Sequence, residues 1–183
     1  VLRVVLLAIA LSGCTVAPAR ERLEYANQLA ARADLEHETP RASGFTIATW
    51  SRLSAPGRPL HVYIEGDGRA WRTRYRPSRD PTPVSPVGLQ MAIQDPSPNV
   101  VYIARPCQYV MPMGRPDAGC GYEAWTTARF GEKAVKSINQ VISRYVRRLD
   151  APSVQLMGYS GGGAMSVLVA ARRNDVGAIR TVS

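Results

Sequence analysis

Histidine is nearly absent from this sequence, which limits the metal and acid–base sites that it can form. Two histidines, His37 and His61, occur in 183 residues, and none follows residue 61. There are three cysteines, and no second pair of Cys or His stands at the spacing of zinc ligands. We therefore expect no metal site and no organic cofactor, and we place His61 in a strand and His37 at the end of a helix.

Lysine is also scarce, so the basic character of the chain comes from arginine. Two lysines and 21 arginines stand against 14 acidic residues, and the net charge is +9. Such a surface favours anionic partners such as phosphate groups or acidic lipid headgroups. The alternative is a solvated, arginine-rich surface with no partner, because no long basic block or recognition helix is visible.

The amino-terminal apolar run is too short to span a bilayer, whose hydrocarbon core is about 30 Å thick. This run, Val4–Leu11, follows Arg3 and precedes the small residues Ser12 and Gly13. The pattern is typical of a secretory signal peptide, which we place over residues 1–13.

The residues LSGC, which end at Cys14, resemble the lipobox of bacterial lipoproteins. The resemblance implies cleavage before Cys14, acylation of that residue, and a membrane partner reached through this lipid anchor. Thr15 in place of Asp resembles an outer-membrane sorting pattern, so we expect the protein in the cell envelope, at the outer membrane facing the periplasm. Nucleic acid is a poor partner for an exported chain. The alternative is that Cys14 is an ordinary small residue of a discarded peptide.

The other two cysteines, Cys107 and Cys120, flank a segment rich in proline and glycine that has no helical or strand period. In the oxidising compartment that a signal peptide implies, such a pair predicts a disulfide. Closing a loop of about 14 residues contributes roughly 3 kcal/mol in the loop-entropy account.

Helical and strand patterns alternate along the rest of the chain. Residues 131–149 give the clearest helix, with one apolar stripe and basic side chains elsewhere around it. We expect further helices over residues 21–36, 88–94 and 162–173. We expect strands over residues 45–50, 59–66, 99–104, 153–158 and 178–183, with an irregular segment over 67–87. This alternation predicts an α/β fold with a mostly parallel sheet flanked by helices.

One serine stands among four glycines directly after an apolar run. Gly158-Tyr159-Ser160-Gly161-Gly162 fits the pattern G-x-S-x-G, which requires a sharp strand-to-helix turn with the serine at its apex. Side chains two positions before and after the apex would collide, and Gly158 and Gly162 are the small residues there. The segment has neither the Gly-Lys-Ser/Thr of a phosphate loop nor the third glycine of a dinucleotide motif. The alternative is a glycine turn with an incidental serine.

On this motif, the strand VYIEGDG and the order of elements, the chain resembles the α/β-hydrolase family. The resemblance implies that Ser160 is the nucleophile and that the amide of Gly161 is half of an oxyanion hole. The other half comes from the loop after an earlier strand, where Glu65 stands in place of the histidine often found there. Between the amides of Asp67 and Gly68, we favour Asp67 as the second donor.

The order of residues in that family is serine, acid, histidine, and the sequence after Ser160 has Asp175 but no histidine. Asp175 comes too early for the acid, so we expect it on the surface. We therefore divide the chain into the signal peptide, a lipidated amino terminus with tether and helix over residues 14–40, and a partial α/β-hydrolase domain over residues 41–183. The later strands, the acid and the histidine are expected to be missing, which leaves the fragment alone inactive.

The function that we expect is that of a membrane-anchored serine hydrolase acting on a small-molecule or lipid ester. One alternative is a catalytically inactive hydrolase-fold lipoprotein that binds envelope components or anionic lipid. Another is a basic anion-binding lipoprotein that works through RAWRTRYRPSRD, residues 69–80, where five arginines alternate with Trp71 and Tyr75. The simpler interpretation of that segment is a solvated loop.

Overall fold

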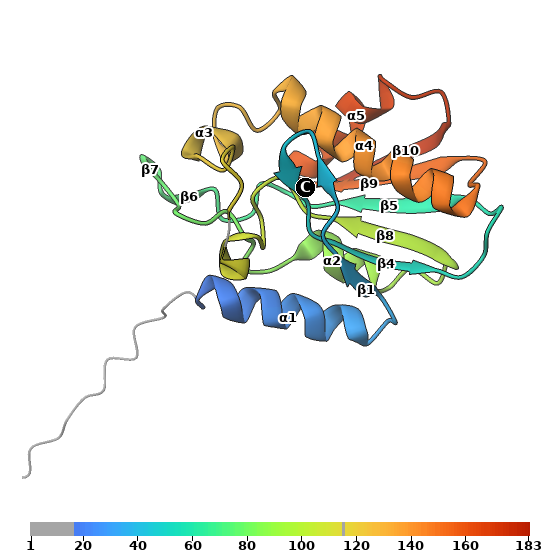
Figure 1. Cartoon of the computed structure of the whole chain (residues 1–183), viewed down its shortest axis with the longest axis horizontal. Helices are drawn as coiled ribbons and strands as arrows, with labels where there is room; N and C mark the ends of the chain where they lie inside the picture. The colour runs from blue at the N-terminus through green and yellow to red at the C-terminus, as the bar shows by residue number, and fades with distance from the viewer. Residues whose placement is uncertain (1–16, 115) are drawn as a thin grey trace, which may run out of the picture.

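The computed structural model describes residues 17–114 and 116–183 (Figure 1). The predicted signal peptide and Cys14 lie outside the described residues. The helices are α1 (Ala19–Ala31), α2 (Val87–Ala92), the 3-10 turn η1 (Met111–Met113), α3 (Tyr122–Trp125), α4 (Glu132–Leu149) and α5 (Gly161–Ala170). The strands are β1 (Glu36–Glu38), β2 (Arg41–Ala42), β3 (Phe45–Thr46), β4 (Thr49–Leu53), β5 (Leu60–Ile64), β6 (Trp71–Thr73), β7 (Arg76–Pro77), β8 (Asn99–Ile103), β9 (Val154–Tyr159) and β10 (Val176–Val182).

Six strands form one mixed sheet in the order β1-β4-β8-β5-β9-β10. β5 runs parallel to β8 and β9, and β9 runs parallel to β10. β4 is antiparallel to β8, and β1 is antiparallel to β4. The predicted α/β fold with a mostly parallel, helix-flanked sheet is confirmed.

Helices cover both faces of this sheet, α4 and α5 on one side and α1 and α2 on the other (Figure 1). Successive residues of β8 point to opposite faces, as in any strand. Val101 packs in one apolar cluster with Ile138 of α4, and Tyr102 packs in a second cluster with Leu29 of α1. Burial on both faces explains why β8 is apolar at every position from Val100 to Ile103.

Helix α4 lies where the apolar stripe predicted it, one residue shorter at its start. Its buried side includes Ile138, Val141, Ile142 and Tyr145, which pack on the sheet. Asp150 ends the helix in the left-handed conformation, with φ of 49°. Among the described residues, no helix is both long and apolar enough to cross a membrane.

The first helix is shorter than predicted, and this changes the place of His37. Helix α1 ends at Ala31, and Asp34 turns the chain with φ of 55°. Residues Glu36–Glu38 then form β1 on the edge of the sheet, so the prediction of His37 at a helix end is wrong. Its ring stacks on Trp50 of β4, with centroids 4.4 Å apart.

Two other segments differ in detail from the sequence prediction. The strand expected over residues 45–50 is split into β3, which pairs with β2, and β4, which enters the main sheet. The segment expected to be irregular over residues 67–87 contains the small hairpin β6–β7.

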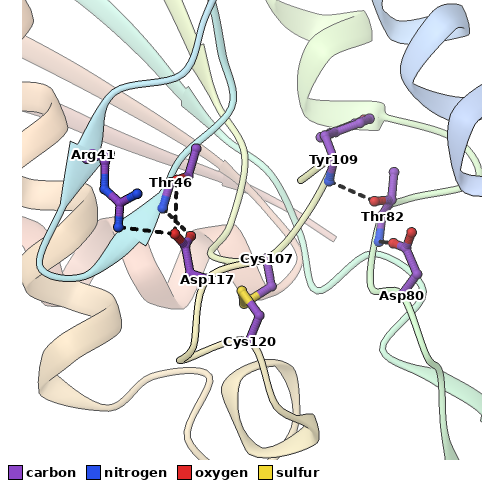
Figure 2. Close-up of a disulfide and its surroundings, with 8 residues drawn as sticks. All are labelled: Arg41, Thr46, Asp80, Thr82, Cys107, Tyr109, Asp117 and Cys120. Atoms are coloured by element: carbon purple, nitrogen blue, oxygen red, sulfur yellow. Dashed lines mark hydrogen bonds and ion pairs between the residues drawn. A yellow bond between two sulfur atoms is a disulfide. The ribbon is translucent and has the colours of Figure 1, made fainter. Parts of the chain in front are cut away.

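The predicted disulfide between Cys107 and Cys120 is confirmed, with Cα atoms 5.5 Å apart (Figure 2). The loop that it closes is bound to other parts of the fold. Asp117 accepts a hydrogen bond of 3.1 Å from the Thr46 hydroxyl, and the amide of Tyr109 donates to the Thr82 hydroxyl at 2.7 Å (Figure 2). The disulfide therefore fixes a segment that also contacts β3 and the chain after the β6–β7 hairpin.

Candidate active site

Ser160 occupies a sharp turn between a strand and a helix. β9 ends at Tyr159 and α5 begins at Gly161, and Ser160 between them has φ of 50° and ψ of −118°. A non-glycine residue in such a conformation costs about 1 to 3 kcal/mol, so the surrounding structure must hold it there. The amide of Ser160 donates to the carbonyl of Val182 on β10 at 2.6 Å, and its own carbonyl accepts from the Gly163 amide at 2.9 Å. Ser160 is exposed at the end of the sheet.

The two small residues on either side of Ser160 are required by close backbone contacts. A Cβ atom on Gly158 would lie 2.3 Å from the carbonyl oxygen of Gly162. A Cβ atom on Gly162 would lie 2.1 Å from the carbonyl oxygen of Ile64, the last residue of β5. No side chain fits at either place without moving backbone, so the turn needs glycine at both.

The loop after β5 packs directly on this turn. A Cβ atom on Gly66 would lie 3.1 Å from the ring of Tyr159 and 3.4 Å from Cβ of Ser160. The side chain of Gln108, which is buried, donates to the Gly66 carbonyl at 3.0 Å. Gly68 has φ of 63°, and a Cβ there would lie 2.1 Å from the carbonyl oxygen of Pro81. These contacts fix the loop against Ser160.

Amide groups with no partner in the described part of the fold lie close to the turn, in the loop after β5 and at the start of α5. Among residues 17–114 and 116–183, the amides of Asp67 and Gly68 donate no hydrogen bond to another residue. Gly161 is the first residue of α5, where an amide has no partner within the helix. The positive end of the helix dipole lies at the same place. The loop and the helix start can therefore stabilise a negative oxygen that forms beside Ser160.

The side chain of Asp67 is held by two arginines. Its carboxylate lies 3.3 Å from Nη1 of Arg105 and 3.2 Å from Nε of Arg129. Burial lowers the pKa of Arg105 to about 10, so its guanidinium stays charged at neutral pH. A Cβ atom on Gly161 would lie only 2.3 Å from the Asp67 carboxylate, so the carboxylate packs against the start of α5. The two guanidinium groups therefore neutralise the carboxylate beside the free amides.

Glu65, at the end of β5, is a buried carboxyl group with three donors around it. It accepts hydrogen bonds from the amide of Gly66 at 3.0 Å, the amide of Gly88 at 3.1 Å and the hydroxyl of Tyr102 at 3.0 Å. Burial raises the pKa of Glu65, although these donors act in the opposite direction. Because its oxygens are engaged by these donors, Glu65 ties the loop to α2 and β8.

A cavity of about 400 Å³ opens beside Ser160. Its walls include Asp67, Arg69, Trp71 and Val84. The cavity thus lies between the turn, the loop after β5 and the β6–β7 hairpin, where a ligand can approach the serine hydroxyl.

Neither histidine of the sequence lies near Ser160. His61 is in β5, as predicted, but it pairs with Gln155 at the far end of β9. There it bonds to Asp95 at 2.7 Å and lines a separate cavity of about 670 Å³. His37 is on β1, four strands from β9, roughly 19 Å away at about 4.8 Å per strand.

Asp175 also lies at the far end of β9, where its carbonyl accepts from the Val154 amide and its carboxylate pairs with Arg173 at 2.6 Å. Within the described ranges, no three His, Cys, Asp or Glu side chains gather into a group that could hold a metal ion.

Sequence reasoning missed the residues that hold the loop after β5. Arg105 and Gln108 follow β8, whose carboxyl end lies beside that of β5 in the sheet. Polar residues directly after neighbouring parallel strands meet at one edge of a sheet, and this signal was present. Arg129 precedes α4 and carries no comparable signal.

No protein-family profile and no curated protein matches this chain. Among solved structures, it is similar to a membrane phospholipase A described as a bacterial virulence factor, with a TM-score of 0.52 and 16% identity over 90% of this chain and 44% of that one. It is also similar to an esterase of Pyrococcus furiosus, with a TM-score of 0.49 and 10% identity over 80% of this chain and 49% of that one. A third similar structure is brefeldin A esterase, a bacterial homologue of human hormone-sensitive lipase. Its TM-score is 0.43, with 12% identity over 90% of this chain and 47% of that one.

The chain thus spans less than half the length of each of these three proteins. At such identities the similarity shows the fold alone. Among these three comparisons, the assignment of the fold rests on the phospholipase, whose TM-score is 0.52. The strand order, the helices on both faces and the strand-to-helix turn at Ser160 agree with it. The chain therefore has the α/β-hydrolase fold, as the sequence resemblance predicted.

Proposed function

We propose that this chain is the nucleophile-bearing part of a serine hydrolase that acts on carboxylic esters. The observation that carries the proposal is the strained backbone of Ser160, an exposed residue on a cavity that the loop after β5 also lines. Folded proteins keep such strain where function needs it. The similarity to a membrane phospholipase A, which is itself an ester hydrolase by name, supports the same reaction class.

In the proposed reaction, the hydroxyl oxygen of Ser160 attacks the ester carbonyl carbon and forms a tetrahedral intermediate. The carbonyl oxygen becomes negative and accepts hydrogen bonds from the amides of Gly161 and Asp67. One such donor lowers a barrier by about 3 kcal/mol in comparable enzymes. Arg105 and Arg129 neutralise the Asp67 carboxylate, which would otherwise repel the developing charge.

A serine hydroxyl needs a general base to act as a nucleophile. His37 and His61 lie too far from Ser160 for this role, as their strand positions show. The proposal therefore assigns the base and its acidic partner to protein outside these 183 residues. The chain spans 44% of the length of the phospholipase, which leaves room for such residues in a protein of that size.

The proposal includes a location. The LSGC sequence that ends at Cys14 supports acylation of that residue and attachment to the outer membrane, facing the periplasm. An ester substrate in that place is either a lipid or a small molecule of the envelope.

The test uses the protein encoded by the complete gene. Ser160→Ala is expected to lower kcat/KM for p-nitrophenyl butyrate by at least about 10³-fold, because the nucleophile is lost. Labelling by a fluorophosphonate probe should disappear in the same variant. The control is Ser54→Ala, which removes an exposed hydroxyl directly after β4, at the end of the sheet where β8 begins. Because that end is opposite the one that carries Ser160, the control should leave both signals unchanged.

Hydrolysis and labelling that persist in Ser160→Ala would contradict the assignment of the nucleophile. A complete wild-type protein that neither hydrolyses esters nor takes the label, yet binds lipid, would instead support the alternative of an inactive hydrolase-fold lipoprotein.

A further inference from the structure

The β6–β7 hairpin, residues 69–79, extends beyond the end of the sheet at which β5 and β9 finish (Figure 1). Its two aromatic side chains are largely uncovered. Trp71 is 47% exposed and Tyr75 is 79% exposed. Large apolar side chains that gather on a protein surface mark sites of interaction.

The five arginines of this hairpin have no acidic partners. Elsewhere in the fold, arginines such as Arg105 and Arg148 pair with carboxylates. Among the described residues, no salt bridge is formed by any of the hairpin arginines, which are Arg69, Arg72, Arg74, Arg76 and Arg79. The hairpin is therefore a concentration of uncompensated positive charge.

Aromatic rings and arginines together match the chemistry of a membrane surface. Trp and Tyr place an apolar ring and a polar edge at the level of the lipid headgroups. Arginine binds phosphate through paired hydrogen bonds. The guanidinium of Arg74 lies 5.6 Å from the centre of the Tyr75 ring, so the two kinds of group are interleaved.

The hairpin also lies close to the amino end of α1 and to the cavity beside Ser160. Arg22, in the first turn of α1, donates to the carbonyl of Thr82 and lies 3.7 Å from Asp80. The amino end of α1 therefore lies beside the base of the hairpin, as Figure 1 also shows. Trp71 and Arg69 at the same time line the cavity that contains Ser160.

From these contacts, we propose that the β6–β7 hairpin docks on the surface of an anionic phospholipid bilayer. Docking turns the cavity beside Ser160 toward the lipid. Binding itself requires no chemistry at Ser160, whereas the delivery of lipid esters to that serine rests on the proposed function.

The test is flotation of the complete protein with vesicles of pure dioleoylphosphatidylglycerol or pure dioleoylphosphatidylcholine. All proteins carry Cys14→Ser, so that acyl chains do not contribute. The hairpin variant combines Arg72→Gln, Arg74→Gln and Arg76→Gln. Its binding to the anionic vesicles is expected to fall about 100-fold, since each arginine near such a surface contributes a factor of about five.

The control combines Lys136→Gln, Arg144→Gln and Arg147→Gln on the exposed side of α4, and removes the same charge. It should change binding less than about threefold, since these residues lie away from the hairpin. Salt should weaken wild-type binding to the anionic vesicles, because the Debye length falls from about 10 Å at 0.1 M to about 3 Å at 1 M. Neutral vesicles should show no such loss.

Two further variants separate the possible results. The double variant Trp71→Ala with Tyr75→Ala should weaken binding to both kinds of vesicle. It tests the contribution of the aromatic rings separately from that of the arginine charges. Ser160→Ala should bind as the wild type does, so a failure of the proposed reaction does not affect this test.

Equal losses in the hairpin and α4 variants would overturn the proposal, because they would mean that only total charge matters. Unchanged binding in the hairpin variant would also overturn it. So would release of the protein by soluble glycerol phosphate when sodium chloride of the same ionic strength releases none.

Discussion

At the scale of single residues, Glu65 joins three parts of the fold through one carboxyl group. The Gly66 amide belongs to the loop that packs on Ser160, the Gly88 amide to α2, and the Tyr102 hydroxyl to β8. The side chain is only 1% exposed, so water cannot replace a missing acceptor. The position of the Gly66–Gly68 loop therefore depends on this group.

We predict that Glu65→Leu lowers the free energy of unfolding by at least about 3 kcal/mol, because it leaves three buried donors without acceptors. Glu65→Gln keeps one carbonyl oxygen and should cost less. Urea denaturation followed by circular dichroism measures both changes. Glu36→Gln, at an exposed position on β1, is the matched control and should stay within about 0.5 kcal/mol of wild type.

The raised pKa of Glu65 predicts that the difference in stability between the wild type and Glu65→Gln depends on pH. Because the folded state binds the proton more tightly than the unfolded state, the stabilising contribution is complete below the unfolded pKa. It is lost as the pH rises through the folded pKa. The wild type should therefore lose stability relative to Glu65→Gln as the pH rises above about 4.3, the ordinary value for Glu. If the wild type instead gains stability relative to Glu65→Gln as the pH rises, the hydrogen-bond donors, rather than burial, dominate the pKa of Glu65.

At the scale of elements, the disulfide joins the end of β8 to the segment before α3. It closes a loop whose Asp117 binds Thr46 (Figure 2). The first residues of this loop include Gln108, whose side chain holds the Gly66 carbonyl. The disulfide-closed loop therefore helps to hold the Gly66–Gly68 loop that packs on Ser160.

We predict that Cys107→Ser with Cys120→Ser lowers the free energy of unfolding by about 3 kcal/mol, the entropy of closing such a loop. Chemical denaturation of the Cys14→Ser protein gives the reference value. Thiol titration of that denatured, unreduced reference should detect no free thiol. Two titratable thiols in the reference protein would contradict the prediction. So would dithiothreitol lowering the stability of the double variant as much as it lowers that of the reference.

The elements that the sequence predicted well are those in which local pattern and tertiary burial agree. Helix α4 has its apolar stripe against the sheet, so the spacing of the stripe determined both ends to within one residue. The β6–β7 hairpin was missed because its residues are exposed and alternate arginine with aromatic groups, so no apolar period marks it. β1 was missed because Ala33, which is partly buried just after α1, continues the helical spacing of Leu29 and Ala30 and extended the apparent helix.

The same distinction applies to the candidate site. The turn at Ser160 could be predicted because the serine and the two glycines that it needs stand within five consecutive residues. The salt bridges of Asp67 could not, since Arg105 and Arg129 come from distant segments that meet only in the folded sheet. Local sequence thus predicts the turn at Ser160, whereas tertiary contacts position the loop after β5.

At the scale of the whole molecule, the amino end of α1, which the proposed lipid anchor precedes in sequence, lies beside the base of the hairpin. Helix α1 begins at Ala19, five residues after Cys14. An extended chain of that length reaches roughly 17 Å. An anchor at Cys14 would therefore keep the amino end of α1, and with it the base of the hairpin, close to the bilayer.

We predict that the complete protein fractionates with membranes and that, in high salt, which weakens binding through the hairpin, Cys14→Ser moves most of it to the soluble fraction. Several acyl chains hold a protein far more firmly than one, and the variant loses all of them. Metabolic labelling with a radioactive fatty acid should mark the wild type and not the variant. A variant that still carries label, or that fractionates unchanged in high salt, would contradict acylation at Cys14.

The hydrogen bond from the amide of Ser160 to the carbonyl of Val182 has a consequence for the order of events during folding. β10 pairs with β9 in parallel, so it can dock only after α5 has carried the chain back to the start of the sheet. Until β10 docks, the amide of Ser160 lacks this acceptor, and nothing on that side holds its strained backbone. We therefore expect the backbone of Ser160 to reach its strained conformation only when β10 has docked.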